Sequence, residues 1–447
     1  KPKEMESYLI LARFFLTQRK NDRAISTLER GVQADPASPL GPYYLAKLFV
    51  QENQVDKGIL QYQKAIALYP GFENAHLELA ALYEREEKRD LAEGVYRHMV
   101  KEVNMEHKEA GLRLVHLLMQ RKAFDEAMEI LHLLLEGDPG NPDIWLKISL
   151  LWSEREEFPK AMEALKRVLA ERPGGTDLTT YMASLYEGMK EYEKAIATYQ
   201  EVIQKEGDKY DIHLRLGSLY FYRLKKTEEA LLEGEQAKKI DPKRPEAYLF
   251  TGLVLYEAER FEEAKERFEK GIEVAPALAN LHFHLGATYD KLSLFDALVR
   301  EMELAISLNA SHAMALNYLG YSYADRGIRL SEAIDLINRA LLLRPDDGYF
   351  MDSLGWAYYK QGKVKEALVL IQKAAALVPD DPVILEHLGE LYLKENQRDA
   401  AYEAWSLSLK LDSKNEKLKA RYKEAGFDGS PFIEHKTEKQ TPLPPGT

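Results

Sequence analysis

The chain has 447 residues, with 61 Lys and Arg against 73 Asp and Glu, a net charge of −12 and no cysteine. This acidic balance disfavours a nucleic-acid binder, because phosphates are held mainly by Lys and Arg. The absence of cysteine excludes disulfides, thiolate nucleophiles and cysteine-based zinc sites.

The start of the chain shows no targeting segment. Lys1-Pro2-Lys3-Glu4 is not followed by the apolar core of a signal peptide, and no apolar run approaches the length needed to span a bilayer, which is about 18 residues. Since the first residue is not Met, we expect that any targeting segment has been removed before Lys1.

From residue 5 onward the sequence repeats. A small residue follows an apolar one every 34 or 35 residues, and an aromatic residue usually stands three positions later. Twelve such units tile residues 5–415 without a gap. The small residues are Ala12, Ala46, Ala80, Val115, Ser149, Ala183, Gly217, Gly252, Gly286, Gly320, Gly355 and Gly389.

Each unit has the apolar spacing of helices. In the eleventh, Met351, Leu354, Gly355 and Tyr358 stand at i, i+3, i+4 and i+7, and a turn at 361–363 precedes a second helical pattern. We therefore predict two antiparallel helices in each unit. The small residue would let the two helices approach closely. Neither pair can bury its apolar face alone, so the pairs must stack on their neighbours.

The small residue also divides the repeats into two halves. It is Gly in all of the last six repeats and Ala, Val or Ser in the first six. After the repeats, a charged segment is expected to form a capping helix that buries Leu418 and Tyr422. The predicted parts are an N-terminal remnant (1–4), repeats 1–6 (5–209), repeats 7–12 (210–415), the capping helix (416–427) and a Pro-rich extended or disordered tail (428–447).

This pattern resembles the tetratricopeptide repeat over residues 5–415. The resemblance implies an all-α fold, a right-handed α-solenoid or superhelix of about twelve helix pairs. In this fold the first helix of each pair lines a concave inner surface. Proteins of this kind bind other proteins, so the resemblance implies a protein-binding adaptor or scaffold.

The same tiling argues against an enzyme. Only residues 1–4 and 416–447 lie outside the repeats, too few for a catalytic domain. The sequence has no phosphate-binding GxxxxGK, no GxSxG, no HExxH and no GxGxxG motif. His282 and His284 are two residues apart on a helix and point to different faces. We therefore expect no catalytic residue, no metal site and no cofactor.

A stripe of aromatic residues predicts where a partner binds. Positions 2, 5, 9 and 12 of the first helix tend to face the concave groove in this fold. Repeats 1–6 have one aromatic residue there, Tyr43, whereas repeats 7–11 have seven. Tyr and Trp are enriched at binding hot spots, although packing on neighbouring helices is the open alternative. The predicted partner-binding residues are Phe221, Tyr256, Phe283, Tyr321, Tyr349, Trp356 and Tyr359.

A closer resemblance covers residues 317–405. The runs from Asn317 to Gly327, from Asp352 to Trp356 and from Glu386 to Gly389, ending at Trp405, resemble the C-terminal repeats of long tetratricopeptide lipoproteins of the Gram-negative envelope. Some members of that group scaffold a carboxy-terminal processing protease and deliver substrates to it. The resemblance implies a periplasmic adaptor tethered to the outer membrane. The lipid-bearing cysteine of that group is absent from this sequence.

The sequence thus predicts a non-enzymatic scaffold whose partner is a protein segment or folded domain. We expect no nucleic-acid partner, and contact with a membrane only through a removed N-terminal lipid anchor. A cytosolic assembly scaffold and an accessory subunit of an enzyme complex remain alternatives. A co-chaperone that clamps a C-terminal carboxylate is disfavoured, because no repeat has Asn at position 9 of its first helix.

Overall fold

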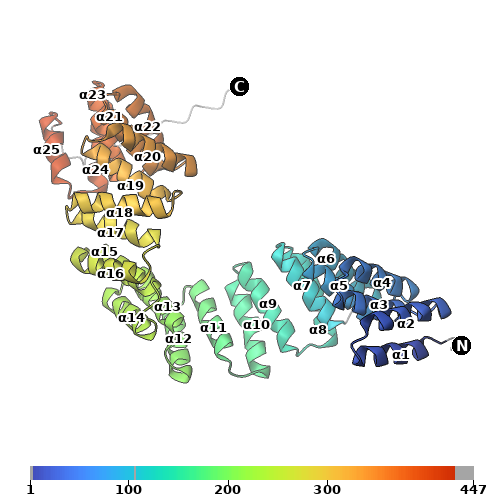
Figure 1. The fold of residues 1–447 in the computed structure, drawn as a ribbon. Coiled ribbons are helices and arrows are strands. Elements are labelled where there is room, and N and C mark those ends of the chain that lie inside the picture. The colour runs from blue at the N-terminus through green and yellow to red at the C-terminus, as the bar shows by residue number, and fades with distance from the viewer. Residues whose placement is uncertain (1–3, 105–106, 428–447) are drawn as a thin grey trace, which may run out of the picture. The chain divides into compact units, whose positions relative to one another are not determined.

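The computed structural model describes residues 4–104 and 107–427, which form helices and turns without a β-strand (Figure 1). Two compact units are distinguished, residues 1–207 and 208–447. Each unit is a stack of antiparallel helix pairs joined by short turns.

The N-terminal unit contains six helix pairs, and the third ends in a π-helical turn, η1. Its elements are α1 (Met5–Thr17), α2 (Asn21–Ala34), α3 (Leu40–Gln51), α4 (Val55–Leu68), α5 (Glu73–Arg85), α6 (Arg89–His98), η1 (Met99–Val103), α7 (Lys108–Gln120), α8 (Phe124–Gly137), α9 (Pro142–Glu154), α10 (Phe158–Glu171), α11 (Thr176–Gly188) and α12 (Tyr192–Glu206).

The C-terminal unit contains six further pairs and a last single helix. Its elements are α13 (Tyr210–Ser218), η2 (Leu219–Arg223), α14 (Thr227–Ile240), α15 (Glu246–Glu257), α16 (Phe261–Val274), α17 (Ala279–Lys291), α18 (Phe295–Leu308), α19 (Ala313–Asp325), α20 (Leu330–Leu343), α21 (Gly348–Lys360), α22 (Val364–Leu377), α23 (Pro382–Lys394), α24 (Arg398–Leu411) and α25 (Glu416–Glu424).

Small residues set the distance between the two helices of a pair, as the sequence predicted. A Cβ atom on Gly389 of α23 would lie 2.3 Å from Cδ1 of Trp405 in α24. At Gly355 of α21 it would lie 2.5 Å from Cγ1 of Ile371 in α22. Since both distances are too short for any real contact, only glycine permits the observed approach.

The turn inside each helix pair has a residue in the left-handed backbone region at the same repeat position, and the turn at 327–329 has a second one, Arg329. These residues recur every 34 or 35 positions and therefore keep the register of the sequence repeat. Ten of them are not glycine and have φ between 57° and 61°. The twelve residues are Arg19, Asn53, Glu87, Lys122, Glu156, Lys190, Lys225, Glu259, Ser293, Gly327, Gly362 and Asn396.

In the C-terminal unit the first helices α19, α21 and α23 pack on one another in sequence. Helix α25 then packs on α24 and covers the end of the stack. Its Leu418 and Tyr422 are buried in one cluster with Trp405 and Phe427. The short, highly charged α25 therefore closes the apolar surface that the last repeat would otherwise expose.

The all-α class and the stack of twelve helix pairs with a final helix are confirmed. The proposed Pro-rich tail, 428–447, lies outside the described residues. Within the part of the chain that the structure describes, no helix is long and apolar enough to cross a membrane.

Candidate functional site

The seven predicted aromatic residues differ widely in exposure. Tyr349 is 54% exposed, Phe283 and Trp356 are buried at 9% and 8%, and the other four are half-buried. The burial of Phe283 and Trp356 favours the alternative of packing on neighbouring helices for these two residues. Both contact rings of the next repeat, Phe283 those of His312 and Tyr318, and Trp356 that of His387. Whether any of the seven binds a partner stays a prediction.

Two of the seven, Phe221 and Tyr256, pack against aromatic residues that are close to them in the sequence. The Phe221 ring lies edge-on to Tyr222, with centroids 5.0 Å apart, and borders the apolar cluster around Phe250. The Tyr256 ring meets Phe261 at 5.5 Å in the same edge-on geometry. These residues contribute to the core of their repeats, and neither contacts the rings of α21.

Three of the seven form a cluster with His387 of α23, in which Trp356 and Tyr321 contact the imidazole and Tyr359 contacts Trp356. The Trp356 ring stacks on the imidazole at 3.9 Å with an angle of 15° between the planes. The Tyr321 ring centroid lies 6.4 Å from the same imidazole, and Tyr359 lies 5.0 Å from Trp356. We use the name α19–α25 face for the surface formed by Tyr321 of α19, Trp356 and Tyr359 of α21, His387 of α23 and Arg421 of α25. Helices α20, α22 and α24 are not part of it.

A buried hydrogen-bonded pair, Asp352 and His387, adjoins the Trp356 ring. Nδ1 of His387 is 2.9 Å and 3.0 Å from the two carboxylate oxygens of Asp352, and both side chains are buried. A buried carboxylate is costly unless it is hydrogen-bonded, so this pair holds α21 and α23 in register. With its imidazole held by Asp352, His387 stacks on Trp356 and positions that ring.

Arg421 of α25 closes one side of the face. Its guanidinium donates to Glu386 at 2.8 Å and also to Glu390. Glu390 accepts a second hydrogen bond from the Tyr359 hydroxyl at 2.8 Å, and Glu386 accepts one from the Asn415 amide at 2.8 Å. Two carboxylates of α23 thus share the single positive charge of Arg421, and Glu390 also holds the Tyr359 hydroxyl.

The surroundings of Tyr321 are acidic. Burial raises the pKa of the Tyr321 hydroxyl above its ordinary value of 10.0, and the negative charges of Asp325, Asp352 and Glu386 raise this pKa further. Asp325 accepts a hydrogen bond from Nε1 of Trp356 at 3.3 Å. The α19–α25 face therefore combines aromatic rings with carboxylates.

Sequence reasoning missed the carboxylates and the histidine of this face. Asp352 and Glu386 occupy position 5 of their helices, Glu390 occupies position 9, and His387 follows Glu386. Positions 5 and 9 belong to the stripe that the sequence analysis scanned for aromatic residues only. Scanning the same stripe for charge in the last three repeats could have found the three carboxylates, whereas His387, at position 6, lies outside the stripe.

His284, next to Phe283 in the sequence, is expected to make the stability of the protein depend on pH. It stacks on Phe268 at 5.7 Å, and burial lowers the pKa of its imidazole from 6.5 to about 4, with a smaller effect of the charge of His312. Between these pH values the unfolded chain binds a proton that the folded chain does not. Stability should therefore fall as the pH falls from 6.5 towards 4.

The free energy of unfolding of the C-terminal unit should therefore be about 2 kcal/mol lower at pH 5 than at pH 8, because only the unfolded chain binds this proton. We expect urea unfolding of His284→Leu to show a smaller loss of stability between these pH values than the unchanged chain, by about that amount. Equal losses in the two proteins would show that His284 is protonated in the folded state.

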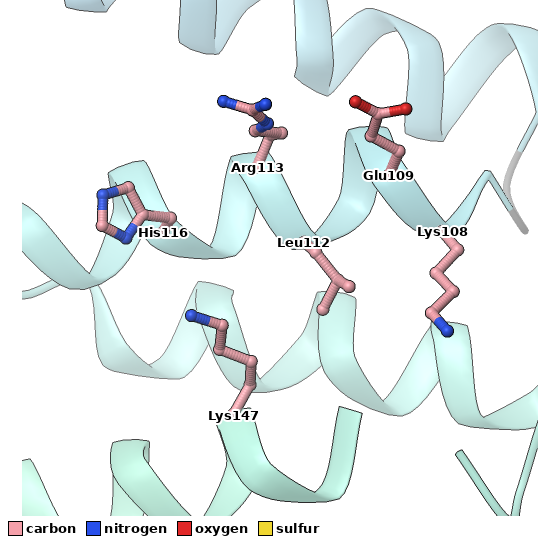
Figure 2. Close-up of a pocket in the computed structure, with 6 residues that line it drawn as sticks. All are labelled: Lys108, Glu109, Leu112, Arg113, His116 and Lys147. Carbon is pink, nitrogen blue, oxygen red and sulfur yellow. The ribbon is translucent and has the colours of Figure 1, made fainter. Parts of the chain in front are cut away.

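In the N-terminal unit, α7 and α9 border a hollow of about 600 Å³. Figure 2 shows the side chains that line it: Lys108, Glu109, Leu112, Arg113, His116 and Lys147. Its positive charge is largely balanced, because Arg113 lies 3.7 Å from Glu84 and Lys108 lies 3.5 Å from Asp143. The hollow lacks aromatic residues, and we regard the α19–α25 face as the stronger candidate for a protein partner.

No group of three or more side chains suited to hold a metal ion occurs in residues 4–104 and 107–427. The α19–α25 face presents hydrogen-bond acceptors and ring faces. Its chemistry is that of a contact surface.

Comparison with known proteins identifies the repeats. Residues 85–151 and 154–214 match one family model described as tetratricopeptide repeat, and residues 329–382 match a second model of the same description. The solved structures that resemble the chain include the Cut9-Hcn1 tetramer of the APC/C, at 15% identity over 94% of this chain and 96% of that one with a TM-score of 0.47. They also include yeast Tom70, at 15% identity over 95% of each chain with a TM-score of 0.43.

Two curated relatives match parts of the chain. A TPR repeat-containing protein of Pseudomonas aeruginosa is 32% identical over 152 residues, which are 32% of this chain and 26% of that protein. A small glutamine-rich tetratricopeptide repeat-containing protein of Mycosarcoma maydis is 37% identical over 73 residues, 16% of this chain and 21% of that protein. The chain thus matches only about a quarter of the length of either relative. These matches show that residues 85–151, 154–214 and 329–382 of the chain are tetratricopeptide repeats.

Proposed function

We propose that this protein is a non-enzymatic scaffold that holds a protein partner, either a peptide segment or a folded domain, on the α19–α25 face. The observation that carries this proposal is the cluster of Tyr321, Trp356 and Tyr359 with His387. Tetratricopeptide-repeat proteins typically bind other proteins. An aromatic residue with a polar tip, held by its neighbours, contributes contact area at little cost in side-chain entropy.

The edge of this surface is available to a partner. Tyr349, at the start of α21, exposes 54% of its side-chain surface, and the half-buried Tyr321 and Tyr359 lie on α19 and on the same α21. The His387 imidazole, hydrogen-bonded to Asp352, stacks on the Trp356 ring and holds it in place. The face is therefore pre-organised, which lowers the entropy lost on binding.

We also propose a place for this activity, the periplasm, with the protein tethered to the outer membrane and a protease and its substrate among the partners. The resemblance of residues 317–405 to envelope lipoproteins supports this proposal. Fractionation of the native host should find the protein with the outer membrane. Recovery in the cytosol would support the alternatives, an assembly scaffold or an accessory subunit of an enzyme complex.

Site-specific crosslinking tests the binding face. A photo-reactive amino acid at Tyr349, introduced in the native host, should give a defined adduct with a protein partner. The matched control is Leu342 of α20, which is 82% exposed but lies on a second helix. We expect the adduct from position 349 to be at least about tenfold more abundant than from position 342, because a specific interface covers one patch of the surface.

The comparison of adduct yields at positions 349 and 342 decides whether the proposed binding face is correct. Equal adducts at both positions would indicate random collision and contradict the proposal. A stronger adduct at position 342 would move the binding surface to the second helices.

A further inference from the structure

A hollow of about 440 Å³ lies between α1 and α3, the first helices of the first two repeats, in the N-terminal unit. Its walls are largely apolar: Leu28 of α2 and Leu48 of α3 are buried, and Leu9 and Leu16 of α1 are half-buried. This volume falls in the range of ligand pockets, which is about 300 to 1,000 Å³. The described side chains of the chain leave the hollow unfilled.

The exposed edge of this hollow is apolar as well. Ile10 of α1 and Tyr44 of α3 both line it, and they are 72% and 43% exposed. A ligand that covers these two side chains removes apolar surface from water, which favours binding. The hollow therefore suits a large apolar side chain of a partner.

The corresponding place in the last repeats is filled. Trp356 and His387 occupy position 9 of α21 and position 6 of α23, and their rings stack at 3.9 Å. Arg13 and Tyr44 occupy these two positions in α1 and α3, and the Tyr44 ring instead meets that of Tyr43, with centroids 5.2 Å apart. The first two repeats thus leave open a space that the last two close with stacked rings.

One positive charge at the hollow is uncompensated. Lys47, at position 9 of α3, is paired with Glu78 at 2.7 Å. Arg13, at the same position of α1, has no carboxylate within 4 Å among the residues that the structure describes. A guanidinium binds a carboxylate through two parallel N–H donors, so a complementary ligand carries a carboxylate beside its apolar group.

We propose that the hollow between α1 and α3 binds an internal segment of a partner protein, which inserts a large apolar side chain and places an Asp or Glu side chain on Arg13. This second binding site belongs to the N-terminal unit and is independent of the α19–α25 face. The apolar walls supply most of the affinity, and the guanidinium selects segments that carry an acidic residue next to the apolar one.

Other ligands fit the hollow less well. A clamp for a chain-terminal carboxylate is disfavoured, because the hollow has a single uncompensated cation and neither α1 nor α3 has Asn at position 9. A nucleic acid is disfavoured because one guanidinium, in a chain of net charge −12, cannot neutralise several phosphates. A side-chain carboxylate within a protein segment needs only the one cation that is present.

Selection from random twelve-residue peptides tests the predicted chemistry. The peptides are fused to their carrier through the C-terminus, so none has a free terminal carboxylate. Those that bind the full chain but not its Arg13→Glu variant should carry Leu, Ile or Phe within three residues of Asp or Glu. In one such peptide, synthesised with an amidated C-terminus, replacing the apolar residue by Ala should weaken binding at least about tenfold, and replacing the acid by Gln about fivefold. Fluorescence anisotropy measures both changes.

Charge exchange locates the carboxylate on the protein. Arg13→Glu should weaken the binding of this peptide at least about tenfold, and a peptide with Lys in place of the acid should recover binding to this variant. Arg30→Glu is the matched control, because Arg30 is an exposed residue of α2 outside the hollow that also lacks a carboxylate within 4 Å in the described part of the chain. It should leave the binding unchanged. Circular dichroism of each variant confirms that it is folded.

A second pair of substitutions tests the apolar edge. Ile10→Ser should weaken the binding by removing an exposed apolar side chain from the hollow. Leu68→Ser removes an exposed leucine from α4, outside the hollow, and should have no effect.

Several results would overturn this inference. They are a selection that yields no peptide dependent on Arg13, an equal loss of binding in Arg13→Glu and Arg30→Glu, and failure of the Lys peptide to bind Arg13→Glu. Binding that requires a free C-terminus would instead identify a clamp for a terminal carboxylate and would also contradict the proposal. The crosslink at position 349 tests the α19–α25 face separately, so either site can fail without the other.

Discussion

Replacing Trp356 with alanine is expected to destabilise the C-terminal unit by about 3–5 kcal/mol. The indole is buried, stacks on His387 at 3.9 Å and donates to Asp325 at 3.3 Å. Its removal leaves a cavity between α21 and α23 next to the buried, hydrogen-bonded pair of Asp352 and His387. Urea unfolding followed by circular dichroism, rather than by tryptophan fluorescence, measures the change without the signal of the lost ring.

Tyr349→Ala is the matched control on the same helix. Because this side chain is 54% exposed, we expect a change of less than about 0.5 kcal/mol. Trp356→Ala should therefore lower the stability, whereas Tyr349→Ala should leave the stability almost unchanged and weaken partner binding. A Trp356→Ala protein as stable as the unchanged chain would show that the indole is free to contact a partner.

The second large effect is expected at Asp352. Its carboxylate and the His387 imidazole are both buried and are hydrogen-bonded at 2.9 Å. Asp352→Ala should cost about 3–5 kcal/mol, because it leaves a buried polar ring without its partner. The exposed Asp346, in the turn before α21, provides the control, since Asp346→Ala removes the same charge outside the core.

A double variant separates the pair from general packing. Replacing Asp352 and His387 together by leucine removes both polar groups, and we expect it to recover much of the stability that Asp352→Ala loses. Thermal and urea unfolding of the three proteins give the comparison. A double variant less stable than Asp352→Ala would mean that the shape of the pair, and not its hydrogen bonds, holds the helices together.

Much of the fold followed from the sequence, because the repeat is local. The 34-residue spacing of the small residues and the helical apolar pattern within each unit predicted twelve helix pairs, and Gly355 and Gly389 lie where the helices approach most closely. A charged segment with Leu418 and Tyr422 at helical spacing predicted the last helix and its buried side. Each of these features depends on neighbours in the same or the next repeat.

The surface that a partner can reach was decided by the tertiary structure. Position along a helix predicts the face on which Trp356 and Tyr349 lie, yet one is covered and the other is exposed. The difference arises because His387, from the following repeat, lies over the indole and is held there by Asp352. Such a contact depends on the side-chain lengths and charges of two repeats together, and a pattern read within one helix does not contain it.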